Sequence, residues 1–388
     1  QNVILKCMHP EQLRRVILRI VTSLMNLIIG PSGAWYALGL EGLCLYIIVN
    51  VFTKSVVAEI SALNEKISRL GYRISPIFLI SAGFLPLISS NWYTFVIIVP
   101  ILLATYVGLF WTGFHGIRKL RTLKNERESV RTFQHYEIVS TLLAAFLVLF
   151  LKQVEMVSYA GYIGSILAFI ALIIPMKIGE GTIRISSGDM LNQEVILARL
   201  TTGSFGIIGF STVWCMRIIA LEYAGISGIA GMVALSSLGG HIISNLNDKK
   251  LRPETADNKN WIWGTNIVIT GILIMIGSLI LSLEEFFLTG YLITRGGTSG
   301  ILHPLEVRIS GELLIGDGGE IGLRERIKFR TQTKIMFFYL ICNYMLYNII
   351  GEINLILIVL LPLITSLYCC KLNLEIIDYL KTHQRVQG

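Results

Sequence analysis

Charged side chains are scarce in this sequence, and acidic ones are scarcer than basic ones. Only 15% of its 388 residues are Asp, Glu, Lys or Arg, whereas 53% are hydrophobic, and the mean hydropathy is +0.66. A chain with so little polar surface is a poor candidate for a soluble globule. The composition therefore predicts a protein embedded in a membrane, and the segments described below predict that it is all-α.

The sequence also lacks the motifs of the common enzyme classes. It has no Walker-type phosphate loop, no nucleophile elbow built on Ser, no paired catalytic carboxylates and no cluster of metal ligands. The six Cys lie mostly in apolar runs without metal-ligand spacing, so we expect buried or lipid-facing thiols rather than disulfides. These absences predict no enzyme activity, no cofactor, no bound metal and no ATP-driven pump.

What the sequence does have is a series of apolar runs of about 17–25 residues, the length that crosses a hydrocarbon core of about 30 Å. We expect each run to be a helix, because short gaps join them and lipid leaves no backbone group unpaired. Shorter alternating segments, as in a β-barrel, are not seen. The twelve expected spans are about 16–36, 39–58, 74–90, 93–113, 136–152, 157–176, 200–220, 226–245, 261–282, 285–304, 333–350 and 353–370.

The gaps between these runs alternate in charge. All of the 33 Lys and Arg residues except Lys54, Lys152, Arg217 and Arg295 fall in alternate gaps or toward the termini, and the other gaps are short and acidic. By the positive-inside rule the basic gaps and both termini are cytoplasmic. Their positive charge suits anionic membrane lipids better than nucleic acid. We expect a multi-pass protein of a bacterial-type plasma (inner) membrane.

The basic gaps also recur every six spans. His115 ends the fourth span and His303 ends the tenth, and each precedes a long basic loop with an Arg-Glu pair. The segment 177–199 is polar and contains Gly and Ser, as an interdomain linker does. The expected domains are therefore a six-helix bundle at 1–176, a cytoplasmic linker at 177–199 and a second six-helix bundle at 200–388.

Two six-span halves in one orientation, joined by a cytoplasmic linker, resemble the major facilitator superfamily of secondary transporters. In that family a Gly-x-x-x-Asp-Arg-x-Gly-Arg-Arg-like signature follows the second span and is echoed after the eighth. Ser68 and Tyr72 depart from it here, as do Asn64 and Ser244 at the leading Gly. The resemblance implies two bundles around a central cavity, with these loops latching one conformation; the matching residues are Arg69, Gly71, Arg73, Asp248, Lys249 and Arg252.

One charge lies deep within an expected span. Arg295 falls near the middle of the tenth span and is followed by Gly296 and Gly297, which would allow a bend or a close approach. A charge at that depth costs several kcal/mol on insertion scales, so it faces a cavity or a partner. In the resembled family the first, fourth, seventh and tenth spans line the central path. Arg295 then either holds an anionic group of the substrate or pairs with an acid such as Glu41 or Glu285.

Further polar and aromatic residues within the spans are candidates for substrate binding or for helix packing. Trp111 and Trp214 are likewise candidates either for substrate binding or for helix packing. Arg217 lies near an outer end and suits anchoring. His115 and His303 suit interfacial hydrogen bonds, and less readily a proton relay. The candidates for substrate contact are Arg295, Tyr291, Trp214, Asn26, Tyr106 and Asn343.

These patterns predict a secondary transporter that rocks its halves around a central cavity. Glu41, Glu137 and Glu285 all lie close to an interface, so exchange of a proton for a cationic drug at a deep carboxylate is disfavoured. The expected partners are membrane lipids, a small or amphiphilic solute that is anionic or neutral, and a coupling ion, H⁺ or Na⁺, if transport is coupled. The alternatives are a non-transporting scaffold or receptor-like protein, and a lipid or glycolipid flippase.

Overall fold

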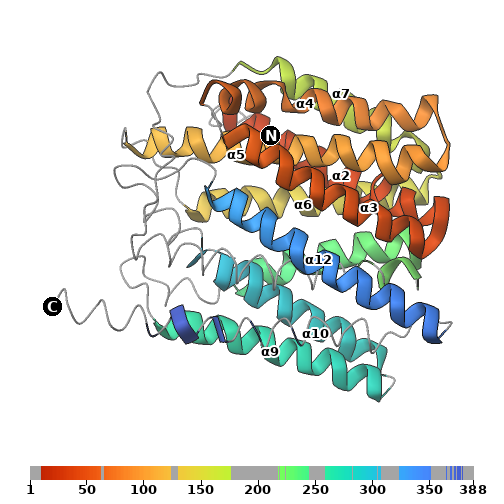
Figure 1. Cartoon of the computed structure of the whole chain (residues 1–388), viewed down its shortest axis with the longest axis vertical. Coiled ribbons are helices and arrows are strands. Elements are labelled where there is room, and N and C mark those ends of the chain that lie inside the picture. Colours follow the sequence, from red (N-terminus) through yellow and green to blue (C-terminus); the bar gives the residue numbers. More distant parts are fainter. Residues whose placement is uncertain are drawn as a thin grey trace. The chain divides into compact units, whose positions relative to one another are not determined.

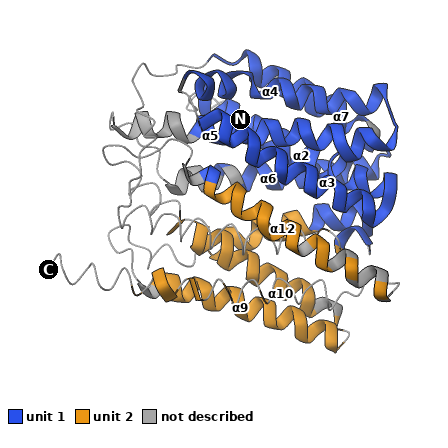
Figure 2. Ribbon diagram, viewed as in Figure 1, with its two compact units in different colours: residues 1–185, 220–231, 320–326 blue, residues 186–219, 232–319, 327–388 orange. Residues whose placement is uncertain are grey.

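The computed structural model describes residues 10–62, 65–123, 130–175, 217, 219–222, 224–243, 258–281, 283–303, 305–306, 323–350, 364, 368, 371–372, 374–376 and 378. These residues are almost entirely helical and include no strand. The chain forms two compact units (Figure 2). Unit 1 comprises residues 1–185, 220–231 and 320–326, and unit 2 comprises residues 186–219, 232–319 and 327–388.

Unit 1 begins with two helices, of which the second is interrupted between the first two expected spans. Helix α2 (Pro10–Ile28) is followed by α3 (Pro31–Ala62), and α3 is interrupted at Leu38 and Gly39. Gly39 has φ of 60°, a region that a residue without Cβ enters at little cost. The first expected span thus consists of α2 and the start of α3, and the second is the rest of α3.

The remaining helices of unit 1 lie alongside these (Figure 1). Helix α4 packs against α5 and α7, α2 packs against α6 and α7, and α3 packs against α5. Several helices extend beyond the expected spans, because bilayer thickness limits the apolar stretch and not the helix itself. Their bounds are α4 (Glu65–Ile88), the π-helix η1 (Thr94–Ile98), α5 (Val99–Leu123), α6 (Val130–Gln153), the 3₁₀-helix η2 (Val157–Tyr159) and α7 (Ala160–Ile173).

Unit 2 is built around α9 (Asn258–Ile280) and α10 (Glu284–Gly297), which pack along each other. Helix α10 continues into the π-helix η3 (Thr298–Leu302). The helix Ala224–Ile243 and α12 (Leu323–Ile350) each begin in unit 1 and continue in unit 2. The expected spans at 200–220 and 353–370 lie mostly outside the described residues.

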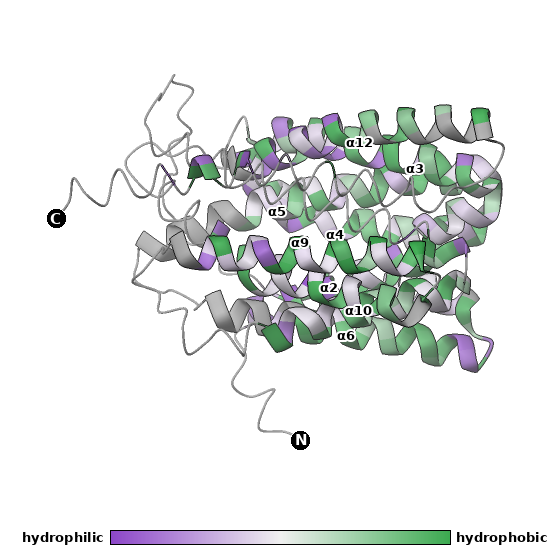
Figure 3. Cartoon of the chain, turned by 90° about the horizontal axis from the view of Figure 1, so that it is seen from below, coloured by the Kyte–Doolittle hydropathy of each residue, from purple (hydrophilic) through white to green (hydrophobic). Residues whose placement is uncertain are grey.

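Five helical stretches among the described residues are long and apolar enough to cross a membrane. The first, Pro10–Ala62, contains two of the expected spans; Ile138–Gln153 and Ala160–Ile173 are apolar but shorter. In Figure 3 hydrophobic residues run along most of α6, with a hydrophilic patch at its end. These features support an integral, multi-pass membrane protein.

Close packing in unit 1 depends on a face of small residues along α7. The buried positions on that helix are all small, and Gly161 meets Gly83 of α4 so closely that a Cβ at Gly161 would lie 2.5 Å from the Gly83 carbonyl oxygen. Ser165 Oγ donates to the carbonyl of Ile80 at 3.0 Å. Lipid is as apolar as a side chain, so helices in a membrane associate through such packing and hydrogen bonds. The buried face consists of Ala160, Gly161, Gly164, Ser165, Ala168 and Ala171.

Candidate functional site

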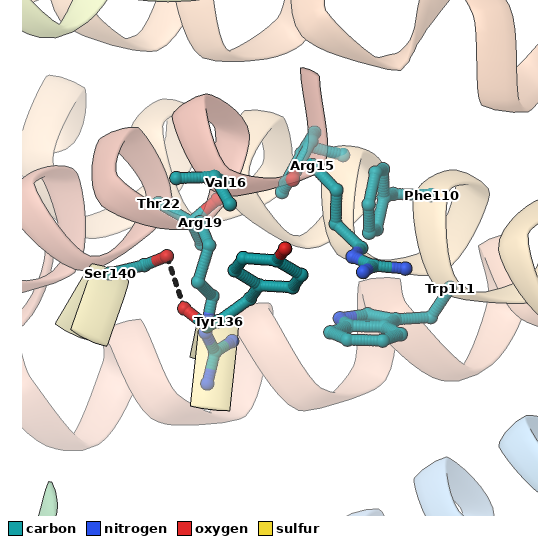
Figure 4. A pocket seen from close by; sticks show the side chains of 9 residues that line it. Arg15, Val16, Arg19, Thr22, Phe110, Trp111, Tyr136 and Ser140 are labelled. Carbon is teal, nitrogen blue, oxygen red and sulfur yellow. Dashed lines mark hydrogen bonds between the residues drawn. The ribbon is translucent and has the colours of Figure 1, made fainter. Parts of the chain in front are cut away.

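A pocket opens in unit 1 between α2, α5 and α6 (Figure 4). Its cavity volume is about 10 Å³, room for about one water molecule, and the remaining space between its walls is open to the exterior. Two arginines and four aromatic residues are among the nine that line it, so the pocket combines positive charge with flat apolar surfaces. The lining residues are Arg15, Val16, Arg19 and Thr22 of α2, Tyr106, Phe110 and Trp111 of α5, and Tyr136 and Ser140 of α6.

Helical spacing places these side chains on a common side. Arg15, Arg19 and Thr22 follow one another at intervals of four and three residues, so they share one face of α2. The Thr22 hydroxyl donates to the carbonyl of Leu18 at 2.6 Å, and the Ser140 hydroxyl donates to the carbonyl of Tyr136. Both hydroxyls therefore bond within their own helices, as Ser and Thr often do in helix interiors.

The aromatic side of the pocket is an ordered stack. The rings of Tyr106 and Phe110 are 5.4 Å apart between centroids and nearly parallel, and Trp111 meets Phe110 edge-on at 5.3 Å. The Arg15 guanidinium lies 5.3 Å from the ring centroid of Phe114. In Figure 4 the Arg15 side chain extends toward Phe110 and Trp111, and Arg19 extends past Tyr136. Cation–π attraction helps to hold Arg15 at the aromatic wall.

No acidic residue is among the nine that line the pocket. The nearest acid along α2 is Glu11, which lies one turn before Arg15 and is only 5% exposed. The side chain of Glu137, next to Tyr136, lies outside the described part of the structure. The pocket lining itself therefore has two basic side chains and no acidic one.

The neighbouring Arg14 has a different role. It is only 1% exposed, and it donates from Nε to the carbonyl of Ala171 and from Nη2 to the carbonyls of Tyr72 and Arg73, each at 3.0 Å. The Tyr72 carbonyl lacks its usual helical partner because Pro76, four residues later, has no N–H. Ala171 lies in the last turn of α7, where carbonyls also lack helical donors. Arg14 thus joins α2, α4 and α7 through three backbone carbonyls, of which those of Tyr72 and Ala171 lack a helical N–H donor.

In unit 2 Arg295 is held by a hydroxyl of a neighbouring helix. Its Nε donates to Ser236 Oγ at 2.8 Å, and Ser236 also hydrogen-bonds Tyr291. Arg295 is half-buried, and Tyr291, one turn earlier on α10, is 3% exposed. Arg217 contributes a second positive charge near the Tyr291 hydroxyl. Two of the residues predicted to contact substrate, Arg295 and Tyr291, therefore lie together.

The backbone beside Arg295 approaches other helices closely. A Cβ at Gly296 would lie 2.2 Å from Ile243 Cδ1, and one at Gly297 would lie 2.9 Å from Ile267 Cγ2. The helix then changes to π-helical geometry at Thr298–Leu302. A π-helical turn inside an α-helix is frequent at functional positions.

The other predicted substrate residues are dispersed. Tyr106 lines the pocket of unit 1. Asn26 donates from Nδ2 to the Thr22 carbonyl of its own helix at 2.8 Å, so its amide is engaged locally. Trp214 lies outside the described residues, and only the backbone of Asn343 is described.

Of the residues predicted to latch one conformation, the structure describes only those in the loop after the second span. Gly71 is buried, and a Cβ there would lie 2.8 Å from Leu109 Cδ2, so this glycine permits close packing of α4 on α5. Arg69 is half-buried and Arg73 is exposed. The loop after the eighth span, which contains Asp248, Lys249 and Arg252, lies outside the described residues.

Unit 1 contains an ion pair that the sequence analysis did not single out. Arg326 Nε donates to Glu59 Oε2 at 2.7 Å, which joins the start of α12 to the end of α3. Both side chains are about one quarter exposed. The two residues are 267 positions apart, so no local pattern could have paired them.

Of the two histidines predicted as proton carriers, His303 has a described side chain. Its Nδ1 lies 3.4 Å from Oε2 of Glu306, which is fully buried. His115 belongs to α5, but its side chain is not described. The described residues contain no group of three or more His, Cys, Asp or Glu that could hold a metal ion.

The sequence analysis missed Arg15, Arg19, Tyr136 and Ser140 as a site. Their positions near the ends of expected spans favour lipid anchoring when each is considered alone. The four-residue intervals between Arg15 and Arg19 and between Tyr136 and Ser140 indicated that each pair shares a helix face. They did not indicate which helices face each other. Only the arrangement of α2, α5 and α6 around the pocket brings these residues together.

The fold is similar to those of three solved transporters. A crystal structure of a bacterial homologue of the iron transporter ferroportin, outward-facing with soaked iron, has a TM-score of 0.61 and 13% identity, covering 96% of this chain and 99% of that chain. A crystal structure of an autoinhibited peptide transporter of the POT family has a TM-score of 0.64 and 11% identity, covering 95% and 96%.

The third is the fucose:proton symporter of E. coli, with a TM-score of 0.60 and 11% identity, covering 94% of this chain and 97% of that chain. No protein-family model and no curated protein matches the sequence. At these identities the likeness concerns the fold alone. The predicted resemblance to the major facilitator superfamily is confirmed at that level.

Proposed function

We propose that this chain is a secondary transporter that moves a small or amphiphilic solute, anionic or neutral, by alternating access. The observation that carries the proposal is the likeness of fold, over nearly the whole length of each chain, to three transporters named for iron, peptides and fucose. Because proteins with this fold carry solutes as unlike as iron, peptides and fucose, the fold favours a transport function but does not identify the solute. The proposed layout is twelve helices in two bundles, 1–176 and 200–388, joined by the linker 177–199.

The preference for an anionic group is based on Arg295. A guanidinium within a spanning helix is costly unless it faces a polar cavity or a partner. Its Nε donates to Ser236 Oγ, and Tyr291 lies one turn earlier on the same helix, so the guanidinium lies among polar side chains. We propose that Arg295 and Tyr291 contact the solute, with Trp214, Asn26, Tyr106 and Asn343 as further candidates.

A transporter of this kind must hold and release one conformation. We propose that the loops after the second and eighth spans do so through Arg69, Gly71 and Arg73, and through Asp248, Lys249 and Arg252. The ion pair between Glu59 and Arg326 supports this proposal, because it joins the residue after the second expected span to the part of α12 that precedes the eleventh. Ion pairs near helix ends can break and reform as bundles rock.

Solute flux into liposomes that contain the purified protein tests the proposal. The screen should cover organic anions, sugars, peptides and lipids, with and without proton or sodium gradients. We expect saturable flux of at least one anionic or neutral solute above protein-free liposomes. Absence of flux across the whole screen, from protein that remains folded, would favour a scaffold, and lipid movement alone would favour a flippase.

A further inference from the structure

Lys152 is the only basic residue in the short gaps that the expected topology places outside the membrane. It lies in the last turn of α6, and its side chain is exposed. Basic residues are less common in outer gaps than in cytoplasmic ones. The negative end of the α6 dipole favours a cation at this position, but it does not account for the contact that the side chain makes with another helix.

Lys152 contacts a helix that is distant in the sequence. Its Nζ donates to Ser227 Oγ at 2.5 Å, across 75 positions of the chain. Ser227 lies in the first turn of the helix Ala224–Ile243, which corresponds to the eighth expected span. Both residues belong to unit 1. The hydrogen bond therefore joins the outer end of the fifth expected span to the outer end of the eighth.

A second contact reaches the same turn of the helix Ala224–Ile243. Gly225 has φ of 55°, and a Cβ at this glycine would lie 2.7 Å from the hydroxyl oxygen of Tyr36. Tyr36 is 63% exposed and ends the first expected span. Gly225 thus permits both the turn of the backbone and the close approach of Tyr36. Two helices of the first expected half, α3 and α6, therefore meet one turn of the second half.

Both contacts are of a kind that can open and reform. They lie at the surface, where water competes for each polar group. The Lys152 ammonium also lies beside the first turn of a helix, where the positive end of the helix dipole disfavours a cation. The hydrogen bond therefore contributes little net stability, and a small change in free energy is enough to break it.

Another tie lies at the opposite end of unit 1. The ion pair between Glu59 and Arg326 is on the cytoplasmic side in the expected topology. Helix α3 takes part at both ends, with Tyr36 near its start and Glu59 near its end. Because alternating access opens the path on one side at a time, ties at the two ends have opposite effects on which side is open.

We propose that Tyr36, Lys152, Gly225 and Ser227 form an outer clasp, which closes the outer side of the transport path and opens when the path faces outward. The clasp rests on the proposed function, since it has a role only in a protein that alternates its access. It gives Lys152 a specific task, in place of general anchoring at the membrane surface.

A cysteine deeper in the helix Ala224–Ile243 reports the opening. Ser236 follows Ser227 by nine residues, which places it about 13.5 Å further along the helix axis. On a background without native Cys, Ser236→Cys is labelled by an impermeant maleimide applied to the outside of right-side-out vesicles. Lys152→Gln and Ser227→Ala should each raise the labelling rate about fivefold, because loss of a weak hydrogen bond shifts a two-state population by roughly that factor.

Two control variants separate the clasp from general loosening. Gln153→Ala alters the exposed neighbour of Lys152 and should leave the labelling rate unchanged. Glu59→Gln weakens the cytoplasmic tie and should lower the rate or leave it unchanged. An unchanged rate in both Lys152→Gln and Ser227→Ala, or an equal rise in Glu59→Gln, would overturn the proposal.

Cross-linking tests the contact itself, whatever the stability of the variants. Lys152→Cys with Ser227→Cys should be bridged in high yield by a short bis-methanethiosulfonate added from outside, and each single replacement is the control. The bridge is detected on a denaturing gel after cleavage at a protease site inserted in the expected linker 177–199. A yield no higher than in the single variants would also overturn the clasp.

Failure of the clasp and failure of transport give different results. Solute flux together with an unchanged labelling rate would sink only the clasp. A labelling rate that rises in Lys152→Gln and Ser227→Ala, with no flux of any solute in the screen, would support the clasp as a contact that opens and would sink the transport proposal.

Discussion

At the scale of single residues, arginines on one helix turn have opposite roles. Arg14 donates to three backbone carbonyls, whereas Arg15 lines a pocket and its guanidinium lies near the Phe114 ring. The difference follows from the faces of α2 that they occupy, because adjacent helical residues point about 100° apart. Composition alone treats the two as equivalent basic residues near a membrane surface.

Replacing Arg14 by Lys or Ala is expected to destabilise the protein by on the order of 3 kcal/mol, because buried carbonyls would lose charged donors. Lys retains the charge but cannot direct separate N–H groups at carbonyls of α4 and α7. The measurement is thermal unfolding of the purified protein in detergent. Arg73→Lys is the control: its carbonyl accepts from Arg14 while its side chain is exposed, so its melting temperature should match the wild type.

Arg295 is a second arginine whose role single substitutions can test. With a solute identified by the flux screen, Arg295→Ala should lower affinity for an anionic solute by about tenfold or more, and Arg295→Lys should recover part of it. Ser236→Ala removes the hydroxyl that orients Arg295 and should produce an intermediate loss. Unchanged affinity and turnover in both Arg295 variants would show that this arginine has only a structural role.

At the scale of elements, small residues determine which helices can touch. The α4–α7 contact at Gly83 and Gly161 brings backbones together in a way that a single methyl group would prevent. Hydropathy identified both segments as spans but carried no information about their contact. The same applies to Gly264, Gly271, Gly290 and Gly297, which bring α9 and α10 together in unit 2.

Gly161→Ala is therefore expected to lower the melting temperature by several degrees, because the new Cβ would clash with the Gly83 carbonyl oxygen. Gly277→Ala is the matched control, since a Cβ at that helical glycine meets nothing within 4 Å. There the higher helix propensity of Ala should leave stability unchanged or slightly raised. Equal melting temperatures for the two variants would refute the close contact of α4 and α7.

The ion pair between α3 and α12 is testable by exchange of charge. Glu59→Gln and Arg326→Gln should each remove a coupling of about 1 kcal/mol, as measured by a double-mutant cycle on thermal stability. The exchanged pair, Glu59→Arg with Arg326→Glu, should restore part of it. Additive effects in the cycle would show that the two side chains do not interact.

At the scale of the whole molecule, the charge pattern of the gaps predicts an orientation in the membrane. On a background without the six native Cys, Lys66→Cys should react with an impermeant maleimide only from the cytoplasmic side. Gln153→Cys, exposed at the opposite end of the expected topology, should react only from outside. Reaction of both from the same side would contradict the predicted topology.

Much of the fold was predictable because it depends on properties of single segments. Helices are described within all six ranges expected as spans in the first half, although the range 16–36 is divided between α2 and α3 and the apolar helices within 136–152 and 157–176 are shorter. The candidate site was predicted less completely. Arg295 was singled out because a charge within a span is rare, and Tyr291 because it is a polar aromatic residue within the same span; Arg15 and Arg19 were not, because charges near span ends are common.

The sequence by itself determined that this protein lies in a membrane as helices, since hydrocarbon admits long apolar segments only when their backbones are hydrogen-bonded internally. The alternation of basic and acidic gaps added an expected orientation. The tertiary structure decided which arginine faces carbonyl groups, which faces an aromatic pocket and which meets Ser236. Those outcomes depend on how each helix is rotated against its neighbours, and close contacts between distant segments set that rotation.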